Sequence, residues 1–179
     1  MQPEVGNRSN RIKPLVRRIV MPCLLAVCLS CTGRIFYERY QVVEHGWSKE
    51  KEYFFTYEIR DNSVPYRLSL EIRNNSRYPY QNLWLFYSEE QPVGPVLLFD
   101  TLECMLADDH GKWLGRGISI HHSSIPVRTH FRFPHKGQYT FCVRHGMRDT
   151  YLNGIEEIGL HIEVEKEEGR MEKEEGFSP

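Results

Sequence analysis

The sequence lacks a long apolar run, an excess of charge of either sign and a set of paired cysteines, and each shortage excludes a class of protein. The apolar run from Ile19 to Leu29 is about half the roughly 20 residues that a membrane-spanning helix needs. A formal net charge of −1 gives no strong field for nucleic acid or another charged polymer. Beyond Cys31 only Cys104 and Cys142 remain, which excludes a disulfide-rich scaffold.

Motifs for catalysis and cofactor binding are missing as well. The sequence contains no Gly-x-Ser-x-Gly elbow, no glycine-rich phosphate loop ending in lysine, and no His-Glu-x-x-His helix. The stretch 108–111 offers carboxylates suited to calcium, but it has neither the ligand spacing nor the bidentate Glu of an EF-hand. We therefore expect a non-enzymatic protein with no catalytic residues, no metal and no cofactor.

What is present begins with a secretory signal. Basic residues precede the apolar run, and small Ser30 stands directly before Cys31. This pattern is typical of a lipoprotein, so we predict a signal peptide over 1–30 and lipidation of Cys31. Two or more acyl chains, palmitate among them, anchor a protein stably to a bilayer. The absence of acidic residues at 32–34 favours a periplasm-facing outer-membrane position. Soluble secretion, with Cys31 unmodified, is the alternative.

The body of the chain, 31–164, has the pattern of β-structure. Segments 51–60 and 67–73 alternate between two faces, and segment 83–88 is apolar nearly throughout, as a central strand covered on both sides would be. Further strands are expected at 96–106, 128–133, 138–144 and 158–164. Turn signals between short strands predict an all-β fold, an antiparallel β-sandwich of Ig-like or jelly-roll-like type, with about seven to eight strands. Segment 165–179, rich in Glu, Lys and Gly, is predicted to be a disordered charged tail.

The parity of the strands places the two remaining cysteines on different faces. Cys104 alternates in phase with Leu102 and Leu106, whereas Cys142 is in phase with Thr140 and Arg144. We expect one thiol to face the core and the other to face away. A disulfide between them in an oxidising periplasm stays open as the alternative.

Aromatic and acidic residues in two polar stretches are the candidates for contact with a partner. Tyr78 and Tyr80 follow the turn at 74–77, and Trp113 lies in a glycine-rich loop with Asp108 and Asp109. Aromatics in such loops are frequent hot spots for a protein partner, and they also suit stacking on a sugar. The alternative is that they cover the ends of the core.

Several blocks of the sequence resemble the gliding-motility lipoprotein GldH family. The blocks are DTLE at 100–103 with LADDHGKWLGRG at 106–117, IRNNSRYPYQNL at 72–83, FP at 133–134 with GQYTF at 137–141, and MR at 147–148 with GIEEIG at 154–159. The likeness runs from Cys31 to about residue 163, which leaves the charged tail outside it.

The resemblance implies an outer-membrane lipoprotein, on the periplasmic side, of the gliding apparatus and its associated type IX secretion system. Its implied partners are other envelope proteins of that machinery and the lipid bilayer, reached through acylated Cys31, with no nucleic acid. The family has no established catalytic residue or cofactor. A surface carbohydrate-binding lipoprotein is the alternative function.

Overall fold

The computed structural model describes residues 34–94 and 98–165. The predicted signal peptide, the lipidation site Cys31 and the tail from 166 onward lie outside the described residues. Within them every regular element is a strand, and no helix is long and apolar enough to cross a membrane. The strands are β1 (Arg34–Val42), β2 (Trp47–Ser48), β3 (Tyr53–Ile59), β4 (Tyr66–Asn75), β5 (Asn82–Glu90), β6 (Leu98–Met105), β7 (Ile120–Phe131), β8 (Gly137–His145), β9 (Tyr151–Leu152) and β10 (Ile155–Val164).

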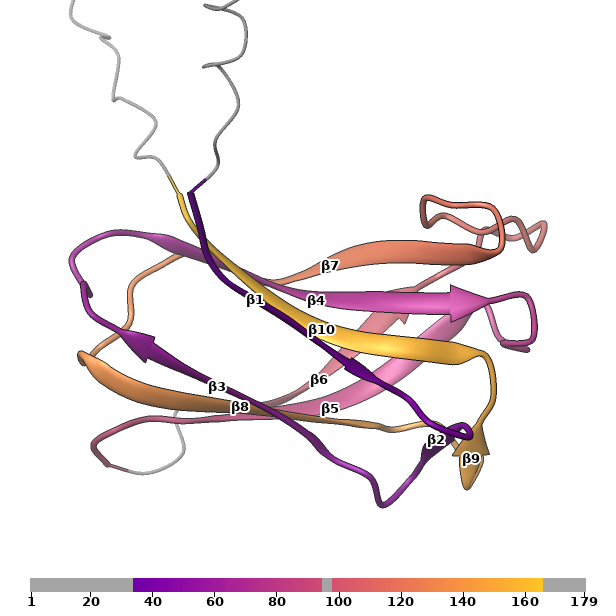
Figure 1. Ribbon diagram of the computed structural model, residues 1–179, viewed down its shortest axis with the longest axis horizontal. Helices are drawn as coiled ribbons and strands as arrows, with labels where there is room; N and C mark the ends of the chain where they lie inside the picture. Colours follow the sequence, from indigo (N-terminus) through magenta and orange to yellow (C-terminus); the bar gives the residue numbers. More distant parts are fainter. Residues whose placement is uncertain (1–33, 95–97, 166–179) are drawn as a thin grey trace, which may run out of the picture. The chain divides into compact units, whose positions relative to one another are not determined.

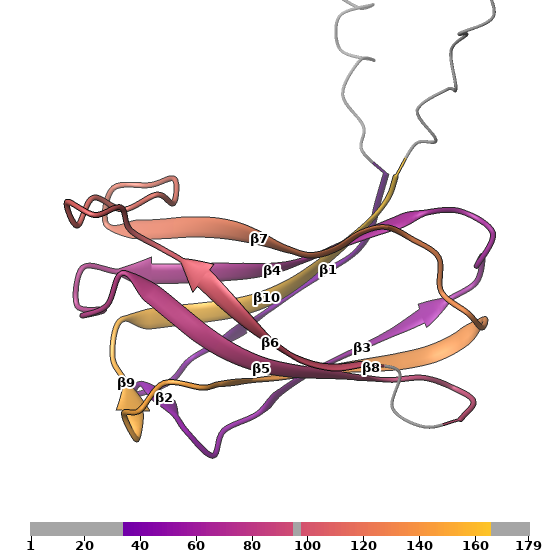
Figure 2. The ribbon, with the colours of Figure 1, turned by 180° about the vertical axis from the view of Figure 1, so that it is seen from behind.

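The eight longer strands form two antiparallel sheets that face each other (Figures 1 and 2). One sheet has the order β1-β10-β4-β7 and the other the order β3-β8-β5-β6, while β2 and β9 pair at one end. Among the eight, only β5 and β6 follow one another within a single sheet, and every other connection crosses between the sheets. This order is that of a jelly roll. The all-β sandwich predicted from the sequence is confirmed, in its jelly-roll form.

The core lies between the sheets and consists of the inward residues of both. Strand β3 alternates as its sequence predicts, with Tyr53, Phe55, Tyr57 and Ile59 buried and the residues between them exposed. From β4 come Leu68, Leu70 and Ile72, all fully buried. Aromatic rings contact one another across the gap, including Tyr66 with Phe133 at 5.2 Å and Phe133 with Tyr139 at 4.7 Å between centroids. Burial of these large apolar side chains is the main force that holds the sheets together.

Strand β5 corrects one expectation from the sequence. Leu83, Leu85 and Tyr87 are buried, but Trp84 is exposed and Phe86 is half-buried on the opposite face. No second layer covers that face within the described residues, so the prediction of a strand covered on both sides is wrong. The Arg144 guanidinium lies 4.8 Å from the centroid of the Phe86 ring and covers part of it instead.

The two cysteines of the described chain face opposite sides of one sheet, as predicted. Cys104 is buried opposite Leu83, whereas Cys142 lies half-buried opposite Phe54 on the outer face. Both thiols are free. Burial raises the pKa of Cys104 to about 12 and that of Cys142 to about 11, so neither is a reactive thiolate at neutral pH.

The first and last described residues lie at the same end of the sandwich. Arg34 pairs with Val164, and Glu165 follows directly (Figure 1). Glu165, which the sequence assigned to the tail, is buried and accepts hydrogen bonds from Arg67 Nε at 2.7 Å and from the His130 amide at 2.6 Å. Burial raises the pKa of this carboxyl, but the Arg67 and His130 bonds outweigh it and lower the pKa below 4.5. Glu165 therefore belongs to the folded β-sandwich.

Candidate interaction surface

Two of the sequence stretches singled out above meet at the other end of the sandwich. The β4–β5 turn and the β6–β7 connection are joined through Gln81, whose carbonyl accepts hydrogen bonds from the amides of Leu106 at 2.7 Å and Ala107 at 3.0 Å. Its side-chain amide donates to the Asp108 carbonyl at 2.7 Å. The residues predicted to contact a partner are thus brought to one place, remote from the end where the described chain begins.

Asp108 organises the β6–β7 connection from within. Its carboxylate accepts hydrogen bonds from the amides of His110 and Lys112, each at 2.9 Å, which closes a turn around Gly111. The neighbouring Asp109 is exposed. Turn chemistry therefore accounts for the Asp and Gly residues here. Across residues 34–94 and 98–165 no group of three His, Cys, Asp or Glu side chains is arranged to hold a metal ion.

The two tyrosines of the β4–β5 turn have different roles. Tyr78 is buried, and its hydroxyl donates to the Asn82 carbonyl at 2.8 Å. Because its ring belongs to the core, the prediction that Tyr78 contacts a partner is wrong. Tyr80 is 36% exposed and packs edge-on against Tyr78, and its hydroxyl donates to Asp149 at 2.7 Å. Of this pair, Tyr80 alone presents its ring to solvent.

Trp113 is half-buried and packs against the core cluster. Its ring is stacked on that of His121 with 5.4 Å between centroids. Trp113 therefore packs the β6–β7 connection against β7. This agrees with the alternative stated for it above, that it covers an end of the core.

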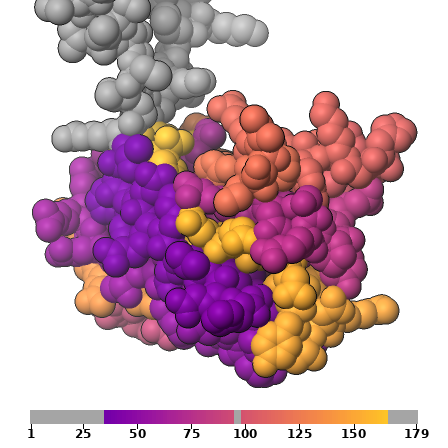
Figure 3. Space-filling view, turned by 45° about the vertical axis from the view of Figure 1, so that its right-hand side comes forward, coloured from indigo at the N-terminus to yellow at the C-terminus, as the bar shows by residue number. Residues whose placement is uncertain are grey.

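Four exposed apolar side chains on the β6–β7 connection and at its two ends are ones that sequence reasoning missed. Ile118 is 95% exposed, Leu114 58%, Ile120 47% and Met105 45%. We call these four side chains the apolar rim. Leu114 and Ile118 lie within the β6–β7 connection, and Met105 and Ile120 lie at its two ends. This connection stands out from the surface in Figure 3 as the salmon atoms at the upper right. The sequence does carry a signal for this surface. Apolar residues stand at 114, 118 and 120 among glycines and a serine, in a loop that would need none if it only faced solvent.

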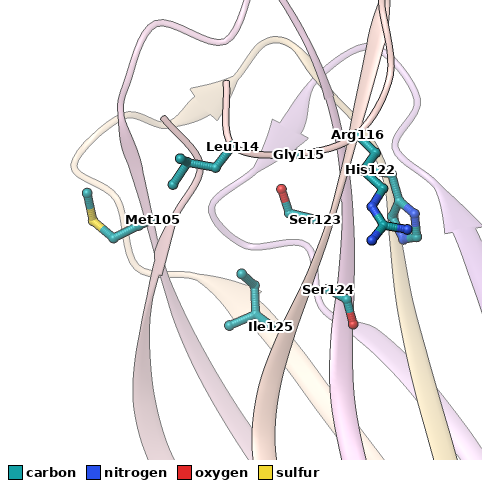
Figure 4. A pocket seen from close by; sticks show the side chains of 8 residues that line it. All are labelled: Met105, Leu114, Gly115, Arg116, His122, Ser123, Ser124 and Ile125. Carbon is teal, nitrogen blue, oxygen red and sulfur yellow. The ribbon is translucent and has the colours of Figure 1, made fainter. Parts of the chain in front are cut away.

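A groove of about 440 Å³ lies beside the apolar rim, between β6 and β7 (Figure 4). Its apolar wall is formed by Met105, Leu114 and Ile125. Its polar side holds Arg116 and the run His122, Ser123 and Ser124.

The polar residues of this groove differ in how they are satisfied. His122 Nε2 lies 2.7 Å from a carboxylate oxygen of Glu71, and the Ser124 hydroxyl donates to the same carboxylate at 2.6 Å. The Ser123 hydroxyl is buried and has no hydrogen-bond partner within the described chain. A buried hydroxyl without a partner is unusual, and a ligand or an ordered water in the groove would satisfy it.

Comparisons with known proteins place the chain among lipoproteins of gliding motility. The family model for the GldH lipoprotein matches residues 34–162, which is nearly the whole of the described chain. The chain belongs to the GldH lipoprotein family. A gliding motility lipoprotein GldH homolog of Christiangramia forsetii is 31% identical over 142 residues, covering 75% of this chain and 86% of that protein. The gliding motility lipoprotein GldH of Flavobacterium johnsoniae is 30% identical over 150 residues, covering 78% and 92%.

Among solved structures, a chain of the infectious bursal disease virus Gx strain aligns over 73% of this chain and 37% of its own length. The TM-score is 0.16 and the sequence identity 12%, values too low to support any argument about this GldH-family domain.

The groove of this GldH-family domain does not have the geometry of a Ser-His-carboxylate triad. Acyl transfer needs a nucleophile that hydrogen-bonds to a base, which a carboxylate orients in turn. Here the Ser124 hydroxyl donates to Glu71 and not to His122. The arrangement of Glu71, His122 and Ser124 is instead a clamp between β4 and β7.

Proposed function

We propose that this GldH-family chain is a non-enzymatic docking protein of the outer membrane, held on its periplasmic side by acylated Cys31. Its partners are other envelope proteins of the gliding and type IX secretion machinery. The observation that carries the proposal is the apolar rim, because exposed apolar side chains grouped on one ordered connection are typical of a protein contact surface.

The placement of the anchor supports this orientation. Cys31 precedes Arg34 so closely in the sequence that the lipid lies at most about 10 Å of chain from the start of β1. Asn75, Ile120 and Ile155 mark the opposite end of the central strands, from which the β6–β7 connection extends. An anchor at one end and contact loops at the other leave the loops free to reach a partner away from the bilayer.

The proposal is tested by crosslinking in the native host, followed by capture of the full chain and of a Cys31→Ala variant. We expect components of the gliding or secretion machinery to be captured with the lipidated protein. We expect them to be lost with the variant, because the anchor concentrates the protein beside its partners. Recovery of no such component with the lipidated protein would contradict the docking function.

A second candidate function is binding of a carbohydrate at the cell surface. It is favoured by a cavity of about 310 Å³ at which Tyr80 and Trp84, both partly exposed, lie near Asn82 and Arg148. Aromatic faces beside amide and guanidinium groups are the chemistry that binds sugar rings. Protease treatment of intact cells separates the two functions, since a surface protein is cleaved and a periplasm-facing one is protected.

A further inference from the structure

The groove between β6 and β7 has an open main-chain edge as well as an apolar wall. The amide and carbonyl of His122 are both bonded to Arg116, at 2.8 and 2.9 Å, and therefore point away from β4. In an antiparallel ladder this orientation repeats every second residue, and the register from His122 to Pro126 against β4 is continuous. The amide and carbonyl of Ser124 consequently point away from β4 too.

Within residues 34–94 and 98–165 no segment covers this edge. On the N-terminal side of Arg116 the β6–β7 connection departs from β7, because the Leu114 amide donates to the Leu106 carbonyl at 2.9 Å instead of pairing with β7. Pro126, which has no amide proton to offer, occupies the next outward-pointing position on β7. The open edge is therefore short, centred on Ser124, and lies along the groove.

The groove also contains one unsatisfied polar group and one unpaired charge. Figure 4 shows the Ser123 hydroxyl directed into the space below Leu114 and Gly115. Ser123 is only 8% exposed, and the hydroxyl has no partner in the described chain. At the rim, Arg116 is exposed and forms no ion pair with any described residue.

From these features we infer that the groove binds a short extended segment of a partner protein, which pairs with the main chain of Ser124. An apolar side chain of the segment packs on Met105, Leu114 and Ile125, and an acidic residue of the segment faces Arg116. The segment supplies the polar partner that the Ser123 hydroxyl lacks. This is addition of a strand to an open sheet edge, in which main-chain bonds hold the peptide and side-chain pockets select it. The inference rests on the proposed docking function and names the chemistry of what docks.

The decisive variant is Ser124→Pro, with Ser124→Ala as its matched control. Proline removes the outward-pointing amide proton of residue 124. It leaves the hydrogen bonds between β7 and β4 intact, because that amide points away from β4. Both variants lose the hydroxyl that donates to Glu71, so they differ only at the main chain. Circular dichroism and thermal unfolding establish that both are folded.

The measurement is photo-crosslinking in the native host, with a photo-reactive phenylalanine analogue in place of Leu114 in one full-length protein and in place of Ile118 in another. Mass spectrometry then identifies the crosslinked peptides. We expect the Leu114 adducts to map to one short segment of one envelope protein, with an apolar residue beside an acidic one. Ser124→Pro should lower their yield about tenfold, the effect of one main-chain hydrogen bond lost in a desolvated groove, while Ser124→Ala retains it. Arg116→Glu should lower it as well.

Three results would overturn the inference in distinguishable ways. Adducts at Ile118 with none at Leu114 would agree with the docking function but would show that the partner does not bind in the groove. Adducts at Leu114 that Ser124→Pro leaves unchanged would refute strand pairing. The absence of adducts at both positions would contradict the docking function itself.

Discussion

Gly154 lies so close to Tyr78 that a Cβ atom on Gly154 would come within 2.2 Å of the Tyr78 backbone nitrogen. The carbonyl of Gly154 also accepts a hydrogen bond from the Asn75 amide at 2.8 Å. The β4–β5 turn therefore packs closely against the turn between β9 and β10, and this contact holds Tyr78 in the core.

Replacing Gly154 with Ala should destabilise the domain severely. The added methyl has no room against the Tyr78 backbone, and the φ of +88° at this position disfavours a side chain in any case. We expect a loss of roughly 3 kcal/mol or more in the free energy of unfolding, measured by denaturant titration. Gly111→Ala is the control, because Gly111 also has a positive φ but nothing within 4 Å. That variant should cost only about 1 kcal/mol. Equal losses in the two variants would show that the close approach to Tyr78 is not what matters.

A buried ion pair between the sheets predicts a second effect. Glu89 on β5 is fully buried and accepts hydrogen bonds from Arg128 on β7 and from the Tyr57 hydroxyl. Arg128→Met leaves that charge without its cation, so we expect a loss of about 3–5 kcal/mol in the free energy of unfolding. The double variant Arg128→Met with Glu89→Gln should recover most of this loss, since the buried charge is gone and Tyr57 keeps an acceptor. A double variant as unstable as the single one would contradict this interpretation.

The buried His145 predicts a dependence of stability on pH. Its ring packs against Trp47 with 5.6 Å between centroids, and burial lowers its pKa below 6.5, with Lys49 and Arg144 adding to the effect. The unfolded chain therefore binds a proton at a higher pH than the folded one. Stability should fall as the pH drops below about 6.5 and should not change from this cause above it. Thermal unfolding of the wild type and of His145→Phe between about pH 7 and pH 5 tests this. An unchanged slope in the variant would assign the pH dependence to other groups.

The parts of the fold that follow strict alternation were predictable from the sequence. Strand β3 shows period-two burial because one face lies on the core and the other in solvent. Strand β1 gave no such signal. A bulge between Ile35 and Tyr37 shifts the register, so that Phe36 and Tyr37 are both partly buried. No periodic pattern in the sequence survives that shift.

The candidate interaction surface lies on loops that the sequence singled out, but only part of its exposed residues were named. The sequence located the loop with Trp113, and the structure places the apolar rim on that same connection. It did not separate Tyr78 from Tyr80, because burial of Tyr78 depends on Gly154, which is distant in the sequence. Ile118 was missed because exposure of a loop residue is a tertiary property.

Docking through the apolar rim is tested most directly by the amount of partner protein that an Ile118→Asp variant captures in crosslinked cells. The comparison is Phe99→Asp, which puts the same charge on another exposed apolar residue, 71% exposed, on β6. Both side chains lie in solvent, so both variants should unfold at the wild-type temperature. We expect Ile118→Asp to lower capture of gliding or secretion components about tenfold, the loss of one contact residue of a hot spot, with Phe99→Asp unchanged. Capture by Ile118→Asp equal to that of the wild type would contradict docking through the apolar rim.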